Sequence, residues 1–267
     1  MKQNLAFLID IDGVVRLGDR PVKGAGDALN SLRAKGIPFL LLTNNSTRPP
    51  EYVADFLKKL GVTVDASEIF TSALATALYL KSNFGEGRSA YVVGESGLIE
   101  AIRSIRWRIV DRWQDAEFVV VGLDTGFNYH KLEQAVRAIV LNNAKFIATN
   151  SDRALIHVDG PKPGAGSMVA AIEYAANAKP FVVGKPNPLV GRLALKKLGV
   201  PENAQIFVVG DRIETDMLLA KRLGAKGILV LTGATKQSDL ESLDQAERPD
   251  FVIESIVELP NLIDKIL

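Results

Sequence analysis

Short apolar runs alternate with longer stretches in which apolar residues recur every three or four positions, along the whole chain. The short runs predict buried strands and the longer stretches predict amphipathic helices. The strands expected are residues 5–9, 38–42, 69–70, 90–93, 118–121, 145–148, 181–183, 205–209, 226–231 and 251–253. The main helices expected between them are residues 24–35, 50–60, 72–81, 98–105, 129–141, 188–198 and 256–266. Such an alternation predicts a parallel α/β architecture.

The first predicted strand ends in two carboxylates, Asp10 and Asp12, followed by Gly13. In an extended backbone the two side chains project from the same face, where they repel each other. A divalent cation with hard oxygen ligands, such as Mg²⁺, can hold both, and Gly13 lets the backbone turn so that amide groups face an anion. The alternative is a solvated acidic turn that only ends the strand. These residues alone favour neither reading.

Three further polar clusters follow predicted strands. They are Thr43-Asn44-Asn45, the lysine Lys185, and the pair Asp211 and Asp216. Each has a structural alternative, such as a helix cap, a surface lysine or a solvated first turn. Ser72 is a separate case and is expected to cap the helix that it begins. Because the carboxyl ends of parallel strands meet at one edge of a sheet, we expect all four clusters to face one crevice. Four coincidences at one edge are less probable than a shared site.

Composition narrows the class of protein. The 267 residues are 47% hydrophobic and 24% charged, as in soluble globular proteins, and the length suggests one large or two modest domains. The net charge of +1 gives no basic excess for nucleic-acid binding. Absence of cysteine excludes disulfides and thiolate zinc sites, and 2 histidines exclude a histidine-rich metal site. The chain has no apolar run as long as a membrane span, and the short apolar run before Asp10 is not expected to act as a signal peptide. We therefore expect no membrane partner and a cytoplasmic location.

The order of the four clusters resembles that of the haloacid dehalogenase superfamily. The matching motifs are Asp-x-Asp-Gly-Val at residues 10–14, Thr-Asn-Asn at 43–45, Gly-Lys-Pro-Asn-Pro at 184–188 and Gly-Asp-Arg-x-x-Thr-Asp at 210–216. The chain is similar to the branch with NagD-like and 4-nitrophenylphosphatase-like enzymes, which carries a large cap between the second and third motifs. The resemblance implies a Rossmann-like doubly wound parallel sheet, formed by residues 1–83 and 180–267, with a smaller α/β cap inserted at 84–179.

The resemblance also implies a magnesium-dependent phosphatase that acts on small phosphorylated metabolites. Asp10 would be the nucleophile that becomes an aspartyl phosphate, and Asp12 the general acid/base, whose backbone carbonyl would bind Mg²⁺. Lys185 would be catalytic too, as a bridge between nucleophile and phosphate. The residues that would bind the phosphoryl group are Thr43, Asn44, Asn45 and Lys185. The residues that would hold the metal are Asp10, Asp12 and Asp211, with Asp216 in support.

The substrate and the assembly stay open at this point. Asp152, Arg153 and His157 lie in a polar part of the expected cap and are candidates to contact the leaving group, although ordinary loop roles are equally plausible. An exposed face of the cap could support a homodimer. Two other functions compete with the phosphatase: a phosphotransferase or mutase, and a non-enzymatic phospho-acceptor or ligand-sensing module. A dinucleotide-dependent dehydrogenase is disfavoured, because no Gly-x-Gly-x-x-Gly follows the first strand.

Overall fold

The protein forms two compact units, each built on its own sheet, in a computed structural model that describes residues 4–155, 160–245 and 247–266. The first unit takes in Met1–Thr43, Val53–Phe70 and Lys185–Leu267. The second takes in Asn44–Tyr52 and Thr71–Gly184. The second unit is therefore wider than the predicted insert at 84–179, which stays a prediction.

The first unit is organised around a six-stranded sheet in the order β15-β14-β13-β1-β4-β5. Its strands are β1 (Leu5–Ile9), β4 (Phe39–Thr43), β5 (Ile69–Thr71), β13 (Gln205–Gly210), β14 (Lys226–Val230) and β15 (Phe251–Ile253). The strand β1 is central and pairs in parallel with β13 on one side and β4 on the other, so that Phe7 lies opposite both Phe207 and Phe39. All five residues of β1 are buried, which explains its uninterrupted apolar sequence.

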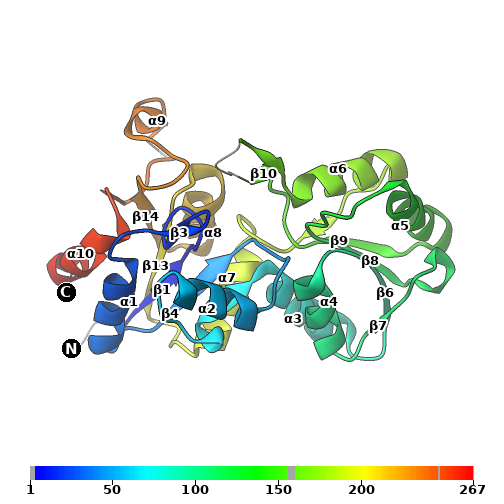
Figure 1. The fold of residues 1–267 in the computed structure, drawn as a ribbon, viewed down its shortest axis with the longest axis horizontal. Helices are drawn as coiled ribbons and strands as arrows, with labels where there is room; N and C mark the ends of the chain where they lie inside the picture. The colour runs from blue at the N-terminus through cyan, green and yellow to red at the C-terminus, as the bar shows by residue number, and fades with distance from the viewer. Residues whose placement is uncertain (1–3, 156–159, 246, 267) are drawn as a thin grey trace. The chain divides into compact units, whose positions relative to one another are not determined.

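Helices cover both faces of this sheet. They are α1 (Ala25–Ala34), α2 (Pro50–Lys59), α7 (Pro188–Leu198), α8 (Leu218–Leu223) and α10 (Leu259–Ile266), with the short α9 (Gln237–Glu241) after β14. On one face α1 packs against α10, and both share a hydrophobic cluster with Leu5, Phe7 and Ile9 of β1. Elsewhere α7 contacts α8 and β4, and α8 contacts β13 and β14. Figure 1 shows these elements around β1 and β13.

The second unit has a five-stranded parallel sheet in the order β12-β9-β8-β6-β7. Its strands are β6 (Ser89–Val93), β7 (Arg108–Ile109), β8 (Phe118–Val121), β9 (Lys145–Ala148) and β12 (Phe181–Val182). Its helices are α3 (Ser72–Phe84), α4 (Ser96–Ser104), α5 (Tyr129–Asn142) and α6 (Ala165–Ala176). The helix α3 packs against α4, whereas α5 packs against α6 and shares a core with Val93 and Val121.

The doubly wound α/β fold predicted from the sequence is confirmed. Two small antiparallel pairs add to it: β2 (Arg16–Leu17) with β3 (Arg20–Pro21), and β10 (Ala154–Leu155) with β11 (Lys162–Pro163). The prediction that Ser72 caps its helix is wrong, because the Thr71 hydroxyl accepts the bond from the Leu74 N–H. Ser72 instead donates a hydrogen bond of 2.6 Å to the backbone carbonyl of Asn44.

Candidate active site

Asp10 lies at the carboxyl end of β1, beside the end of the neighbouring strand β13. Its backbone N–H donates to the Val209 carbonyl at 2.8 Å, so the hydrogen bonds between β1 and β13 extend to Asp10 and fix its backbone. The side chain is 8% exposed, and its Oδ1 accepts from the Ile11 N–H at 2.8 Å. Because β1 and β13 are parallel neighbours at the point where the strand order reverses, Asp10 and Asp211 end at the same edge of the sheet.

Asp211 sits in a tight backbone enclosure directly after β13. A Cβ on Gly13 would lie 2.2 Å from Asp211 Oδ2, and one on Gly233 would lie 2.0 Å from the same atom. Gly13 also has a φ of +87°, so glycine is needed there for two reasons. The Ala234 N–H donates to Asp211 Oδ2 at 2.7 Å, whereas the buried Oδ1 has no hydrogen-bond partner among the described residues. One oxygen is therefore held in place and the other is left available for a ligand.

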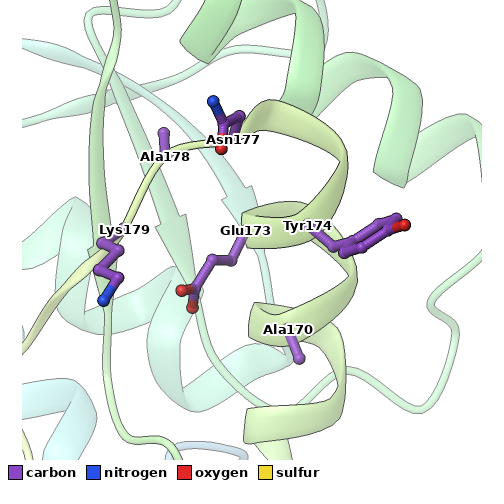
Figure 2. A pocket seen from close by; sticks show the side chains of 6 residues that line it. All are labelled: Ala170, Glu173, Tyr174, Asn177, Ala178 and Lys179. Atoms are coloured by element: carbon purple, nitrogen blue, oxygen red, sulfur yellow. The ribbon is translucent and has the colours of Figure 1, made fainter.

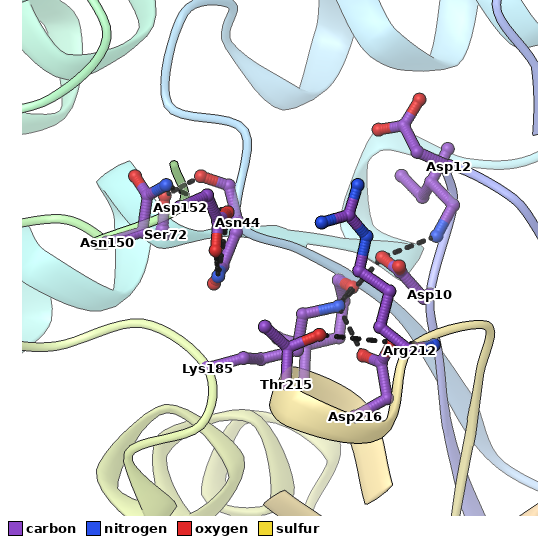
Figure 3. Close-up of polar contacts among 12 residues, drawn as sticks. Asp10, Asp12, Asn44, Ser72, Asn150, Asp152, Lys185, Arg212, Thr215 and Asp216 are labelled. Atoms are coloured by element: carbon purple, nitrogen blue, oxygen red, sulfur yellow. Dashed lines mark hydrogen bonds and ion pairs between the residues drawn. The ribbon is translucent and has the colours of Figure 1, made fainter. Parts of the chain in front are cut away.

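Lys185 joins the two carboxylates on either side of it. Its Nζ lies 2.8 Å from Asp10 Oδ1 and 2.7 Å from Asp216 Oδ1, and it donates to the Leu42 carbonyl at 3.3 Å (Figure 3). Asp216 is fully buried in the π-helical segment Ile213–Met217 that follows β13. From the sequence, Asp216 was expected only to support the metal, so its direct bond to Lys185 is a new element of the site.

Three buried carboxylates of this unit form a group that fits a metal ion. Asp10, Asp211 and Asp216 each offer an oxygen within 4.8 Å of the others. When all three are ionised, they carry two net negative charges together with the ammonium group of Lys185, and one divalent cation would balance these charges. The unpaired Asp211 Oδ1 and an all-oxygen donor set suit a hard cation such as Mg²⁺. The residues present therefore fit the metal that the sequence analysis expected.

The pKa shifts of the cluster reflect the same excess of negative charge. Burial raises the pKa of Asp10 well above its ordinary value, Lys185 opposes this rise, and the neighbouring carboxylates add to it. Burial and Asp216 raise the pKa of Asp211 to about 6, against the opposing bond from Ala234. Burial disfavours the charged form of Lys185, but Asp10 and Asp216 outweigh burial and raise the pKa of its ammonium group. The cluster is therefore short of positive charge.

Asp12 does not join this group through its side chain. Its carboxylate is about half exposed and bonds Arg16, with 2.8 Å between Arg16 Nη2 and Asp12 Oδ1. Figure 3 shows the Asp12 carboxylate pointing away from Asp10. The predicted contribution of Asp12 to the metal, through its backbone carbonyl, stays a prediction. No role for Arg16 was expected, because nothing in the residue pattern pairs it with Asp12.

The second motif begins at Thr43, the buried last residue of β4. The following residues belong to the second unit, where Asn45 Oδ1 accepts from both the backbone N–H and the hydroxyl of Thr47. Asn44 Nδ2 donates to both carboxylate oxygens of Asp152, at 3.1 and 3.2 Å, and Asn150 Nδ2 donates to Asp152 at 2.9 Å (Figure 3). Asp152 thus holds the side chain of Asn44, although the two residues are 108 positions apart in the sequence.

The other residues predicted to contact a leaving group are less defined. Arg153 is exposed, beside the pair β10–β11, and His157 lies outside the described residues. A pocket of the second unit opens at the end of α6, lined by Ala170, Glu173, Tyr174, Asn177, Ala178 and Lys179 (Figure 2). None of the predicted site residues lines that pocket. Within the described ranges, no helix combines the length and the apolar character needed to cross a bilayer.

Comparison with known proteins gives the family. A sequence model of the haloacid dehalogenase-like hydrolases matches residues 7–108, and a second HAD-hydrolase-like model matches residues 182–259. The ribonucleotide monophosphatase NagD of Escherichia coli K12 is 36% identical over 252 residues, which cover 94% of this chain and 96% of NagD. The chain belongs to the haloacid dehalogenase family of hydrolases. The phosphatase names of its relatives agree with the NagD-like branch predicted from the motifs.

Solved structures of family members extend this match to the whole fold. A 4-nitrophenylphosphatase from Thermotoga maritima has a TM-score of 0.88 and 35% identity, with 96% of each chain covered. A glycerol phosphate phosphatase from Mycobacterium tuberculosis, solved with magnesium, has a TM-score of 0.88 and 32% identity, with 97% of this chain and 76% of that one covered. The protein is a phosphatase of this haloacid dehalogenase family, whose members use a divalent metal.

Proposed function

We propose that the protein is a magnesium-dependent phosphomonoester hydrolase that works through an aspartyl phosphate on Asp10. The observation that carries this proposal is the buried group of Asp10, Asp211 and Asp216, with two uncompensated negative charges and an unpaired oxygen on Asp211. A buried charge excess of this kind is costly unless a cation is present. With the cation bound, the same group offers a nucleophile beside a centre of positive charge.

In the first step, an Asp10 carboxylate oxygen attacks phosphorus in line with the leaving group. The ester P–O bond breaks, and the leaving oxygen takes a proton from the Asp12 carboxyl group, which becomes a carboxylate. Mg²⁺, held by Asp10, Asp211 and the backbone near Asp12, would neutralise the phosphoryl oxygens when bound. Lys185, at 2.8 Å from Asp10, supplies a second positive charge and fixes the orientation of the nucleophile.

In the second step, the Asp12 carboxylate takes a proton from a water molecule whose oxygen attacks the same phosphorus. The acyl-phosphate P–O bond breaks, inorganic phosphate leaves, and the Asp10 carboxylate and the Asp12 carboxyl group are restored. One difficult hydrolysis is thereby split into two easier displacements. Asp12 is suited to alternate between acid and base because its carboxylate is partly exposed and stays outside the metal group.

Recognition of the phosphoryl group is assigned to the Thr43–Asn45 motif and Lys185. The side chain of Asn44 is oriented by Asp152, whose two carboxylate oxygens both accept from the Asn44 amide. Choice among small phosphate esters is assigned to the second unit, with Arg153 and His157 as candidate contacts, because the core motifs meet only the phosphoryl group. The names of the relatives mention ribonucleotides, nitrophenyl phosphate and glycerol phosphate, so a small phosphorylated metabolite is the substrate class proposed.

Two finer expectations accompany this function. A homodimer through the second unit is supported by exposed apolar side chains on the packed helices α5 and α6, namely Tyr129, Val140, Leu141 and Tyr174. Light scattering of the wild type and of Leu141→Glu would test it, since a dimer held by this face should dissociate in the variant. A cytoplasmic location stays a prediction, which fractionation of cells that express a tagged chain would test.

The proposed reaction is tested by phosphate release from a panel of phosphate esters with Mg²⁺. Wild type should release phosphate from 4-nitrophenyl phosphate and from at least one metabolite ester. Asp10→Asn should release none while its far-UV circular dichroism and its unfolding transition stay those of a folded protein. Asp27→Asn, in the first turn of α1, is a matched carboxylate control that should keep wild-type turnover. Substantial turnover by folded Asp10→Asn would refute the nucleophile assignment.

A further inference from the structure

Arg16 lies in the small hairpin that follows the first motif, and the proposed reaction does not use it. A tight turn brings it beside Asp12: the Arg16 N–H donates to the Ile11 carbonyl at 3.1 Å, and the Gly13 N–H donates to the Arg16 carbonyl at 2.8 Å. Asp12 and Arg16 form an isolated β-bridge. The 2.8 Å ion pair between their side chains is therefore built on backbone that is already fixed.

Three groups hold the guanidinium group of Arg16: the Asp12 carboxylate, the ring of Phe56 and the backbone carbonyl of Gly18. It lies over the ring of Phe56 in α2, with Cζ 5.0 Å from the ring centroid, and Nη1 donates to the Gly18 carbonyl at 3.3 Å. Its Nε is buried and has no hydrogen-bond partner among the described residues. Burying the unpaired Nε costs free energy, which the other contacts of the guanidinium group have to offset. What this position does provide is a fixed cation against the Asp12 carboxylate.

We propose that Arg16 is a positioning residue for Asp12, and holds its carboxyl group where it meets the leaving-group oxygen. This inference rests on the proposed function, because it needs Asp12 as the general acid/base. Asp12 is half exposed, so without a partner its side chain would sample several rotamers. Arg16, pre-set by Phe56 and the hairpin, restricts that choice. The planar fork of a guanidinium suits this purpose better than an ammonium group does.

The leaving group gives a signature that a structural role would not give. A poor leaving group, such as the alkoxide of an alkyl phosphate, needs the proton from Asp12, whereas 4-nitrophenolate can leave without it. The parameter kcat/KM reports only the steps up to departure of the leaving group, so the shared second step does not enter. Misplacing Asp12 should therefore lower kcat/KM for alkyl phosphates far more than for 4-nitrophenyl phosphate.

The test compares kcat/KM for glycerol phosphate, phenyl phosphate and 4-nitrophenyl phosphate in wild type, Arg16→Gln and Arg16→Lys. Arg33→Gln is the matched control, because Arg33 is also partly buried, pairs with Glu68 and lies over the ring of Phe39. We expect Arg16→Gln to lose at least roughly 10-fold more kcat/KM on the alkyl ester than on the nitrophenyl ester, since general acid catalysis supplies 10²–10⁴-fold. Arg16→Lys should lose less kcat/KM on the alkyl ester than Arg16→Gln does. Arg33→Gln should either keep kcat/KM for all three esters or lose the same factor on each.

Equal losses on all three esters in Arg16→Gln, or no loss, would overturn the positioning role. Asp12→Asn separates this failure from that of the proposed function: if it shows no leaving-group dependence, then Asp12 is not the acid. A crystal structure of Arg16→Gln gives a readout that needs no turnover. The Asp12 carboxylate should leave its wild-type place while the Gly13–Arg16 backbone bond persists, and an unmoved carboxylate would refute the proposal.

Discussion

The Asp211→Asn variant should distinguish the effect of the buried Asp211 carboxylate on stability from its role in binding the metal. In the metal-free protein the pKa of Asp211 is raised from its ordinary 3.8 to about 6, chiefly by burial. At 1.36 kcal/mol per pKa unit, this carboxylate destabilises the folded protein by about 3 kcal/mol at neutral pH. Asp211→Asn removes that charge and adds no bulk. In chelator the variant should therefore be more stable than wild type, by roughly 1–3 kcal/mol.

The same substitution should abolish the metal response, because asparagine cannot satisfy both neighbours of Asp211. If its oxygen keeps the 2.7 Å bond from the Ala234 N–H, then its NH₂ group replaces the unpaired Oδ1 that faces the cluster. If it is turned over, the NH₂ opposes the Ala234 N–H, donor against donor. In the first orientation the metal loses a ligand, and in the second the backbone bond is lost.

The assay is thermal unfolding of both proteins at pH 7.5, in chelator and in Mg²⁺. Metal at 100 times its dissociation constant should stabilise wild type by about 2.7 kcal/mol. Asp211→Asn should show a higher Tm than wild type in chelator and little further rise with Mg²⁺. Its turnover should fall by more than the roughly 10–100-fold typical of an outer-shell group.

Asp250→Asn is a matched control, because Asp250 also accepts a backbone N–H, from Gly227 at 2.8 Å, but pairs with Lys226 instead of the cluster. Its pKa is lowered, so its loss should not stabilise the protein, and its Mg²⁺ response should be that of wild type. An Asp211→Asn protein that is less stable than wild type in chelator, and that keeps the full Mg²⁺ shift, would refute the metal assignment.

Three further predictions follow from the same geometry. Chelation should abolish phosphate release and Mg²⁺ restore it, while Ca²⁺ should bind with poor turnover because its longer coordination misplaces the nucleophile; full activity in chelator would contradict the metal's role. Because the pKa of Asp211 is raised in the folded protein, protonation of Asp211 favours folding, and metal-free wild type should become as stable as Asp211→Asn as pH falls from above 6 to below 4. A difference in unfolding free energy between the two proteins that does not change with pH would contradict this prediction. Asp152→Ala should depress all esters together through Asn44, whereas Arg153→Ala should change the ranking of metabolite esters more than turnover of 4-nitrophenyl phosphate; an unchanged ranking in a phosphate-release matrix would remove Arg153 from substrate choice.

The sequence was sufficient to predict the layers of the fold. Buried strands such as β1 and β8 are continuous apolar runs that end at polar residues or glycine, so their limits agree with the prediction to within a residue. The pairs β2–β3 and β10–β11 were not among the expected strands, because strands of two residues are too short for a periodic signal. Thr71 and Ser72 are adjacent and both carry a hydroxyl group, so side-chain chemistry alone does not decide which of them caps the helix.

Convergence of Asp10 and Asp211 could be anticipated because they follow neighbouring parallel strands of one sheet. Lys185 was expected at the same edge, but it follows β12, a strand of the other sheet, so that reason does not hold for it. The structure brings these three together with Asp216, while their catalytic roles stay predictions. What could not be anticipated is pairing across distance or through a turn. Asn44 and Asp152 are 108 residues apart, and Arg16 meets Asp12 only because Gly13 reverses the backbone between them. Such contacts follow from backbone geometry and not from the kinds of residue present.

The most direct test of the account is to trap the phosphoryl group on Asp10. Asp12→Asn should still accept a phosphoryl group from 4-nitrophenyl phosphate in Mg²⁺, but it lacks the base for the second step, so the aspartyl phosphate should accumulate. Acid quenching followed by peptide mass spectrometry should find one phosphoryl group on the peptide that contains Asp10, with a matching burst of nitrophenolate. Phosphorylation of another residue, or a labelled peptide in the double variant that also carries Asp10→Asn, would contradict the central claim.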